Sequence, residues 1–191
     1  MGPDDPSGWP RPVTVVLHGN YDRPEWECDT WARVAGFHGW VLCPRGVRTP
    51  WASRAEDRWT YSSAAAAASE TEAALAALEA RYPGRVTRDR AVLAGFSLGA
   101  ILAPKIVLDA PGRYPVLFFV EGGEKKLDRA WLRRLARAGV RGLGLAMSAP
   151  GRRARALDAV KRAGRAGVFA VFVDMRGAGH GYSDDFEIGR A

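Results

Sequence analysis

Six short, continuous apolar segments, each followed by a glycine, a proline or a polar residue, constrain the fold of this 191-residue chain most strongly. Continuous apolar runs are typical of strands buried on both faces of a parallel sheet, whereas strands with one solvated face alternate. The segments are 13–17, 40–43, 91–94, 116–120, 143–147 and 168–173. We therefore expect a mainly parallel sheet of about six strands.

Segments with helical character separate the expected strands. The longest, 62–81, is rich in alanine, begins with Ser62 or Ser63 as N-cap and stops at Tyr82-Pro83-Gly84. The other expected helices are 31–37, 98–108, 127–138 and 152–163. The alternation predicts an α/β fold, a doubly wound sheet with helices on both faces. Residues 1–12 contain four prolines and are expected to form an irregular arm before a single domain over 13–191.

The charge of the chain is basic, with a formal net charge of +7. Of the 28 lysines and arginines only four are lysines, and the arginines are scattered through the chain. Because they do not gather in one segment, we expect no nucleic-acid partner. No apolar run approaches the roughly 20 residues of a membrane span. The expected partner is a small molecule, and the sequence leaves the oligomeric state open.

A Gly95-x-Ser97-x-Gly99 motif stands between an expected strand and an expected helix. This is the context of a nucleophile elbow, a sharp turn that raises a serine hydroxyl above the sheet. The helix N-terminus behind Ser97 favours negative charge, and the backbone N–H of Leu98 is well placed to bind an oxyanion. The motif predicts a nucleophilic serine.

A serine hydroxyl is a weak nucleophile without a base. Of the three histidines, His18 and His38 lie near the first two expected strands, whereas His180 follows the last. Glycines on both sides leave the imidazole of His180 free to reach neighbouring strand ends. We expect His180 to be the base.

These motifs resemble those of the α/β-hydrolase superfamily, in particular its small serine esterases of the carboxylesterase, dienelactone hydrolase and acyl-thioesterase kind. The resemblance covers about residues 13–186, starts at the family's third strand and rests on His18-Gly19, the elbow at Ser97 and Gly179-His180. It implies a minimal α/β-hydrolase fold, no cofactor, and a second oxyanion N–H from Asn20 or Tyr21. We expect no metal site either, since no cluster has ligand spacing.

In these enzymes an acid accepts a hydrogen bond from the catalytic histidine and completes a triad with it and the serine. In this chain the position of that acid departs from the family pattern. The family usually has an aspartate just after the strand that is here 143–147, but this chain has Ser148-Ala149-Pro150. We favour Glu121, which ends the preceding strand, where related lipases place their acid. The alternatives left open are Asp174, Glu124, Asp184, Asp185 and the absence of any acid.

Cys28 and Cys43 are the only cysteines and are expected near the same edge of the sheet. A disulfide between them would indicate an exported protein, periplasmic or extracellular, whereas two buried thiols would indicate a cytoplasmic one. The sequence leaves both readings open.

The sequence as a whole predicts a serine hydrolase that cleaves carboxylic esters, with thioesters as a further substrate class of the same machinery. Trp26, Trp51, Trp59 and Tyr21 are expected to form an aromatic wall beside the site. The alternative is a non-catalytic binding protein of α/β-hydrolase fold, which stays open because no aspartate stands directly after the expected strand 143–147.

Overall fold

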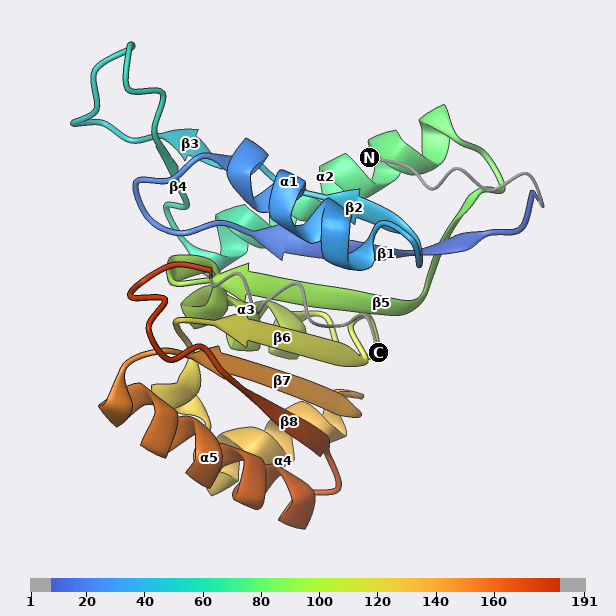
Figure 1. Cartoon of the computed structure of the whole chain (residues 1–191). Coiled ribbons are helices and arrows are strands. Elements are labelled where there is room, and N and C mark those ends of the chain that lie inside the picture. Colours follow the sequence, from blue (N-terminus) through green and yellow to red (C-terminus); the bar gives the residue numbers. More distant parts are fainter. Residues whose placement is uncertain (1–7, 183–191) are drawn as a thin grey trace.

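The sheet at the centre of the molecule has six parallel strands in the order β2-β1-β5-β6-β7-β8 (Figure 1). The computed structural model describes residues 8–182. The strands are β1 (Arg11–Leu17), β2 (Trp40–Leu42), β5 (Val86–Phe96), β6 (Val116–Val120), β7 (Gly142–Met147) and β8 (Phe169–Asp174). The prediction of an α/β fold with about six mainly parallel strands is confirmed.

Helices cover both faces of this sheet, as expected. Five α-helices and one 3₁₀ helix occur among residues 8–182: α1 (Pro24–Ala35), α2 (Ala64–Arg81), α3 (Leu98–Asp109), η1 (Glu124–Lys126), α4 (Arg129–Arg137) and α5 (Pro150–Arg165). Figure 1 shows α1 in front of β1 and β2, with α2 and α3 behind the sheet. The hydroxyl of Ser63 caps α2 by accepting a hydrogen bond from the N–H of Ala66.

Two apolar cores lie on the two faces. The larger core joins alternate residues of the strands, such as Val15, Leu93 and Phe119, to buried residues of α2, α3, α4 and α5. The smaller joins the other strand positions to Trp31 of α1 and to Met175, which follows β8. Burial of both faces accounts for the continuous apolar runs within the strands, such as Val116–Val120 of β6.

Several element boundaries differ from the expected ones. Helix α1 begins at Pro24, seven residues before the expected start, because proline fits the first turn of a helix. Strand β1 begins at Arg11, inside the segment expected to be irregular. The expected helix 127–138 is preceded by η1, and Asp128 caps the helix that follows.

A small antiparallel ladder, β3 (Val47–Arg48) with β4 (Trp59–Thr60), was not expected. Two-residue strands are too short for a hydrophobic period to reveal them. The ladder brings the loop between β3 and β4 to the side of the sheet where the strands end (Figure 1).

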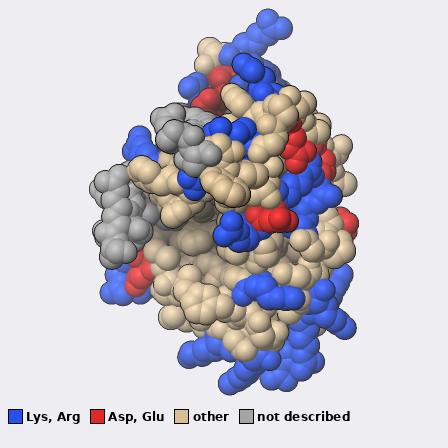
Figure 2. All heavy atoms as spheres, turned by 90° about the vertical axis from the view of Figure 1, so that its right-hand side faces the viewer, with Lys and Arg blue, Asp and Glu red and all other residues tan. Residues whose placement is uncertain are grey.

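The charged surface agrees with the scattered arginines of the sequence. Figure 2 views the edge opposite to the carboxyl ends of the strands, and its Lys and Arg side chains run from top to bottom, interrupted by acidic and uncharged residues. None of the helices described is long and apolar enough to cross a membrane.

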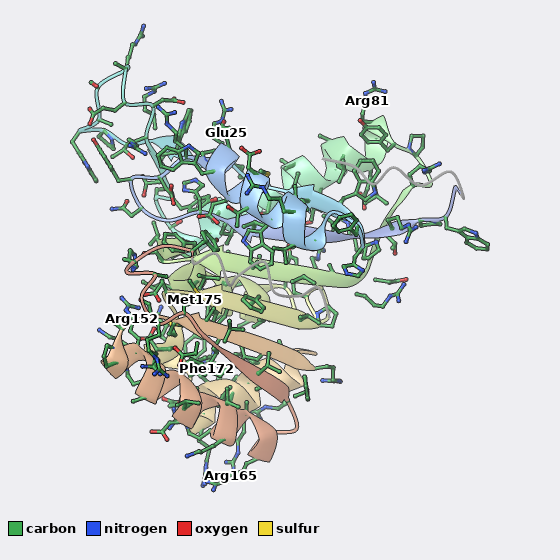
Figure 3. The ribbon with its side chains drawn as sticks, in the orientation of Figure 1. Glu25, Arg81, Arg152, Arg165, Phe172 and Met175 are labelled. Carbon is green, nitrogen blue, oxygen red and sulfur yellow. A yellow bond between two sulfur atoms is a disulfide. The ribbon has the colours of Figure 1, made fainter. Side chains whose placement is uncertain are left out.

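The register of the sheet brings three loops together at its carboxyl edge. Leu17 of β1 pairs with Gly95 of β5, and Phe96 of β5 pairs with Val120 of β6. The residues that follow these strands therefore leave the sheet side by side. Figure 3 shows Arg152, at the start of α5, on this same edge, while Arg165 lies at the far end of the helix.

Candidate active site

Ser97 occupies a strained turn between β5 and α3. Its backbone has φ 47° and ψ −105°, a left-handed conformation that non-glycine residues rarely adopt. Two glycines allow the turn because the chain is crowded there: a Cβ at Gly99 would lie 2.1 Å from the carbonyl oxygen of Leu17, and one at Gly95 would lie 2.5 Å from the backbone nitrogen of Ala100. The Ser97 N–H donates to the carbonyl of Val120 at 2.9 Å, which fixes the turn against β6.

His180 reaches Ser97 from the loop after β8. Its Nε2 lies 3.0 Å from Oγ of Ser97, across 83 residues of sequence. Its Nδ1 lies 3.5 Å from Oε2 of Glu121. The imidazole therefore stands between a hydroxyl and a carboxylate, the order of groups that a general base of a serine nucleophile requires.

Glu121 is the buried carboxylate of this group, with 2% of its surface exposed. Its backbone is left-handed, with φ 52°, and its Oε1 accepts a hydrogen bond from the backbone N–H of Ser148 at the end of β7. The Nε of Arg152 lies 3.9 Å from Oε2, and an Nη of Arg152 donates to the Glu121 carbonyl at 3.0 Å. The N–H donor and the guanidinium group hold the carboxylate in place beside His180.

The other acids considered from the sequence have different partners. Asp174 pairs with Arg176 and Arg153, and the hydrogen bond from Arg176 is the main cause that lowers its pKa. Glu124 is buried and forms ion pairs with Arg152 and Arg155. Asp184 and Asp185 lie outside the described residues.

The candidates for the oxyanion hole lie around Ser97. Leu98 is the first residue of α3, so its N–H has no acceptor within the helix. Asn20 lines the same pocket as Ser97 and Leu98, and its Oδ1 accepts a hydrogen bond from the hydroxyl of Thr60 at 2.7 Å. Tyr21 has φ 58° and donates through its hydroxyl to Glu56, which raises the pKa of Tyr21.

His18 contributes to the shape of this region. It is fully buried, its ring nitrogens lie 2.7 Å from the carbonyl oxygens of Gly19 and Arg45, and its ring packs on Tyr61 at 4.5 Å. It therefore joins the loop after β1 to the loop after β2 and fixes the shape of both.

Two pockets open beside Ser97 and His180. The first has a volume of about 580 Å³ and mostly apolar walls, which include Ser97, Leu98, Val47, Pro50, Trp51 and Ile101. The second, of about 450 Å³, is lined in part by His180, Glu121, Ser148 and Arg152.

The expected aromatic wall is largely wrong. Only Trp51 lines the apolar pocket. Trp26, Trp59 and Tyr21 instead pack against arginine guanidinium groups, at 4.7 Å for Arg58 on Trp26 and 4.9 Å for Arg45 on Trp59. Cation–π packing of this kind was invisible in the sequence because its partners are distant along the chain.

Cys28 of α1 and Cys43, just after β2, form a disulfide with a Cα–Cα distance of 5.9 Å. Within residues 8–182, no group of three or more His, Cys, Asp or Glu side chains is arranged to hold a metal ion.

Sequence reasoning missed the residues that support the site. The Ser148 hydroxyl donates to the carbonyl of Gly179 next to His180, and its N–H holds Glu121. Its position, where the family usually has an aspartate, was the available signal. Tyr182, Glu27 and Trp31 form a hydrogen-bonded cluster behind His180 that no motif indicates.

Comparisons with known proteins agree on the fold. No protein-family model matches the chain, and no curated protein matches it in sequence. An uncharacterised protein from Bacillus cereus superposes with a TM-score of 0.72 at 14% identity over 96% of this chain, which spans 58% of that protein. Esterase PE8 superposes with a TM-score of 0.62 at 20% identity over 98% of this chain and 94% of the esterase. A Bacillus cereus carboxylesterase has a TM-score of 0.61 at 16% identity over 98% and 88% of the two chains.

The six-stranded parallel sheet and these similarities define the class: the chain has the α/β-hydrolase fold. A six-stranded parallel sheet with helices on both faces agrees with a minimal form of that fold.

Proposed function

We propose that this protein is a serine hydrolase that cleaves carboxylic esters, with Ser97 as nucleophile, His180 as general base and Glu121 as the acid of the triad. The observation that carries the proposal is the 3.0 Å approach of His180 Nε2 to Ser97 Oγ, with Glu121 3.5 Å from the other ring nitrogen. A hydroxyl, an imidazole and a buried carboxylate in this order are what acyl transfer through a serine requires.

The proposed reaction has two halves. Ser97 Oγ attacks the ester carbonyl while His180 Nε2 takes its proton, and the same imidazole then protonates the departing alcohol oxygen, leaving an acyl-serine. Water adds to the acyl carbonyl as His180 again removes a proton, and the acid leaves as Ser97 regains its hydrogen. Glu121 stabilises the imidazolium that forms in each half.

Negative charge on the carbonyl oxygen in both halves would be stabilised by backbone N–H groups. We assign these to Leu98, at the N-terminus of α3, and to Asn20 or Tyr21. The positive end of the helix dipole beside Ser97 adds to this stabilisation. Asn20 lines the pocket together with Ser97, which favours it over Tyr21.

Backbone strain supports the same site. Within residues 8–182, five non-glycine residues have positive φ, and three of them, Ser97, Glu121 and Tyr21, belong to the proposed catalytic group or its oxyanion loop. Strained residues gather at functional sites because the surrounding structure must hold them in place.

The apolar pocket suits an uncharged acyl or alcohol group of modest size, and its openness to solvent fits a small ester. The names of two similar structures, an esterase and a carboxylesterase, support ester hydrolysis as the reaction. Thioesters are a second substrate class for the same groups.

The disulfide supports an oxidising compartment, and we propose that the protein functions outside the cytoplasm.

Hydrolysis of a short-chain nitrophenyl ester by the wild type, Ser97→Ala and His180→Asn tests the function. We expect turnover by the wild type and a loss of about a thousandfold or more in either variant. Specific binding of an ester without turnover would instead support the non-catalytic binding protein.

A further inference from the structure

The segment that carries His180 has no helix or strand of its own. Residues 175–182 follow β8 and return along the carboxyl edge of the sheet toward β5 and α1 (Figure 1). Glycines stand at 177, 179 and 181, and the first two have positive φ. A general base must be held within about 0.5 Å of its productive position, so contacts outside this segment have to hold the imidazole.

Tyr182 provides such a contact two residues after His180. Its hydroxyl donates a hydrogen bond to Oε2 of Glu27 and accepts one from Nε1 of Trp31 at 3.1 Å. Both partners lie on α1, one turn apart, so the hydroxyl is held at two points of a single helix. Burial raises the pKa of Tyr182 well above its usual range, which keeps the hydroxyl protonated as a donor.

The ring of Tyr182 connects this anchor to the nucleophile. It stacks on Phe96 at 5.3 Å, and Phe96 also packs against the imidazole of His180 at 5.2 Å. Since Phe96 directly precedes Ser97, the same aromatic ring contacts the segment of the base and continues into the turn of the nucleophile.

Burying the carboxyl group of Glu27 at this place costs free energy. It is 2% exposed, and its hydrogen-bond partner in the structure is a neutral phenol rather than a cation. Asp22 is the charged group that acts on it, and it acts in the same direction as burial. Apolar residues would pack α1 at lower cost, so the carboxyl group indicates a role beyond packing.

We propose that Glu27, Trp31 and Tyr182 are positioning residues for His180, and that they transmit the fixed position of α1 to the imidazole. The inference rests on the proposed function in one respect, that His180 acts as the base. Their hydrogen bonds join α1 to the segment that carries the base, so their effect is on the approach of the base rather than on the chemistry itself.

Kinetics of Tyr182→Phe test the inference, because this change removes one hydroxyl and keeps the ring on Phe96. We expect kcat for a nitrophenyl ester to fall by about ten- to a hundredfold and KM to change by less than about twofold, since the apolar pocket is untouched. Glu27→Leu is expected to match it, whereas Glu27→Gln, which keeps a neutral hydrogen-bonding group, is expected to retain kcat within about threefold. Tyr82→Phe, on an exposed tyrosine packed against Trp40, is the matched control.

Whether the losses of kcat in the single variants add up in the double variant separates a positioning role from a general destabilisation of the fold. If the residues act as one unit, the double variant Glu27→Leu/Tyr182→Phe loses no more kcat than the worse single variant. Wild-type kcat in both Tyr182→Phe and Glu27→Leu would overturn the inference, even if both variants melt at lower temperature.

The imidazole NMR signals of His180, identified by their loss in His180→Asn, provide a readout that does not depend on catalysis. We expect one sharp set in the wild type and Tyr82→Phe, and broadened or doubled signals in Tyr182→Phe. Unchanged signals in Tyr182→Phe would contradict the inference. If the wild type hydrolyses no ester but the His180 signals still broaden or double in Tyr182→Phe, the result would contradict the proposed function alone.

Discussion

The backbone N–H of Ser148, at the end of β7, donates a hydrogen bond to Oε1 of Glu121, at the end of β6. The acid that faces His180 therefore follows one strand directly and is held by the residue that directly follows the neighbouring strand. The position after β7, where the resemblance places an aspartate, still serves the acid, but through its backbone. Glutamate has one more methylene than aspartate, and it reaches within 3.5 Å of the imidazole from β6.

Replacing the acid tests this arrangement. We expect Glu121→Gln to lower kcat by about a hundred- to ten-thousandfold, because the amide no longer stabilises the imidazolium. Circular dichroism is expected to show an intact fold. Asp174→Asn is the matched control, since Asp174 pairs with arginines instead, and it is expected to keep wild-type kcat. The assignment of Glu121 fails if the two variants behave alike.

The strain at Ser97 has a measurable cost in stability. Glycine adopts positive φ without penalty, so we expect Ser97→Gly to be more stable than Ser97→Ala by roughly 1 kcal/mol in urea unfolding, while both are inactive. Equal stability, or a less stable glycine variant, would show that the turn is not strained.

Glu27 makes stability depend on pH. Burial raises the pKa of Glu27 from 4.5 to about 8, so between these pH values the folded protein binds a proton that the unfolded chain has lost. The free energy of unfolding therefore falls as pH rises from about 4.5 to about 8, and this contribution levels off above that range.

Glu27→Gln removes the titratable carboxyl group, and with it this dependence of the free energy of unfolding on pH. We expect the variant to exceed the wild type at pH 8 by on the order of 2–4 kcal/mol, with the difference vanishing near pH 4.5. Urea unfolding of both proteins at intervals of one pH unit measures it. A constant difference across the range would mean that Glu27 titrates normally.

The disulfide closes a loop with a sequence separation of 15 residues. Loss of such a link costs about 3 kcal/mol through the entropy of the unfolded chain. We therefore expect Cys28→Ala/Cys43→Ala to unfold at lower urea concentration by a corresponding amount. Alkylation of the denatured wild type without reductant should modify neither cysteine, and modification of both would contradict the link.

The sequence was sufficient for much of the architecture because buried parallel strands carry a strong local signal. The run 116–120 coincides with β6, and the elbow at Ser97 lies between a strand and a helix as its glycines require. The start of α1 was misjudged because Pro24 and the charged residues after it have no clear apolar period. The two-residue strands of the β3–β4 ladder are too short to show an apolar period.

The candidate site also contains residues that the sequence predicts and residues that it does not. Ser97 and His180 are candidates from the sequence because glycines and chain order mark them, and the structure places Nε2 of His180 3.0 Å from Oγ of Ser97. From the sequence, Glu121 is favoured by its place at a strand end while Asp174 stays open, and only the three-dimensional arrangement provides the partners of each carboxylate. The support from Ser148, Glu27 and Tyr182 consists of long-range side-chain contacts, and such contacts follow from no local pattern in a single chain.

The most direct test of the central claim is covalent labelling with a fluorophosphonate, followed by mass spectrometry of the digested protein. An activated serine attacks phosphorus and displaces fluoride, whereas an ordinary serine hydroxyl does not react. We expect one adduct per chain, located on Ser97, with labelling absent in Ser97→Ala and slowed by about a hundredfold or more in His180→Asn. No adduct on Ser97, or labelling of Ser97 at the same rate without His180, would contradict the account.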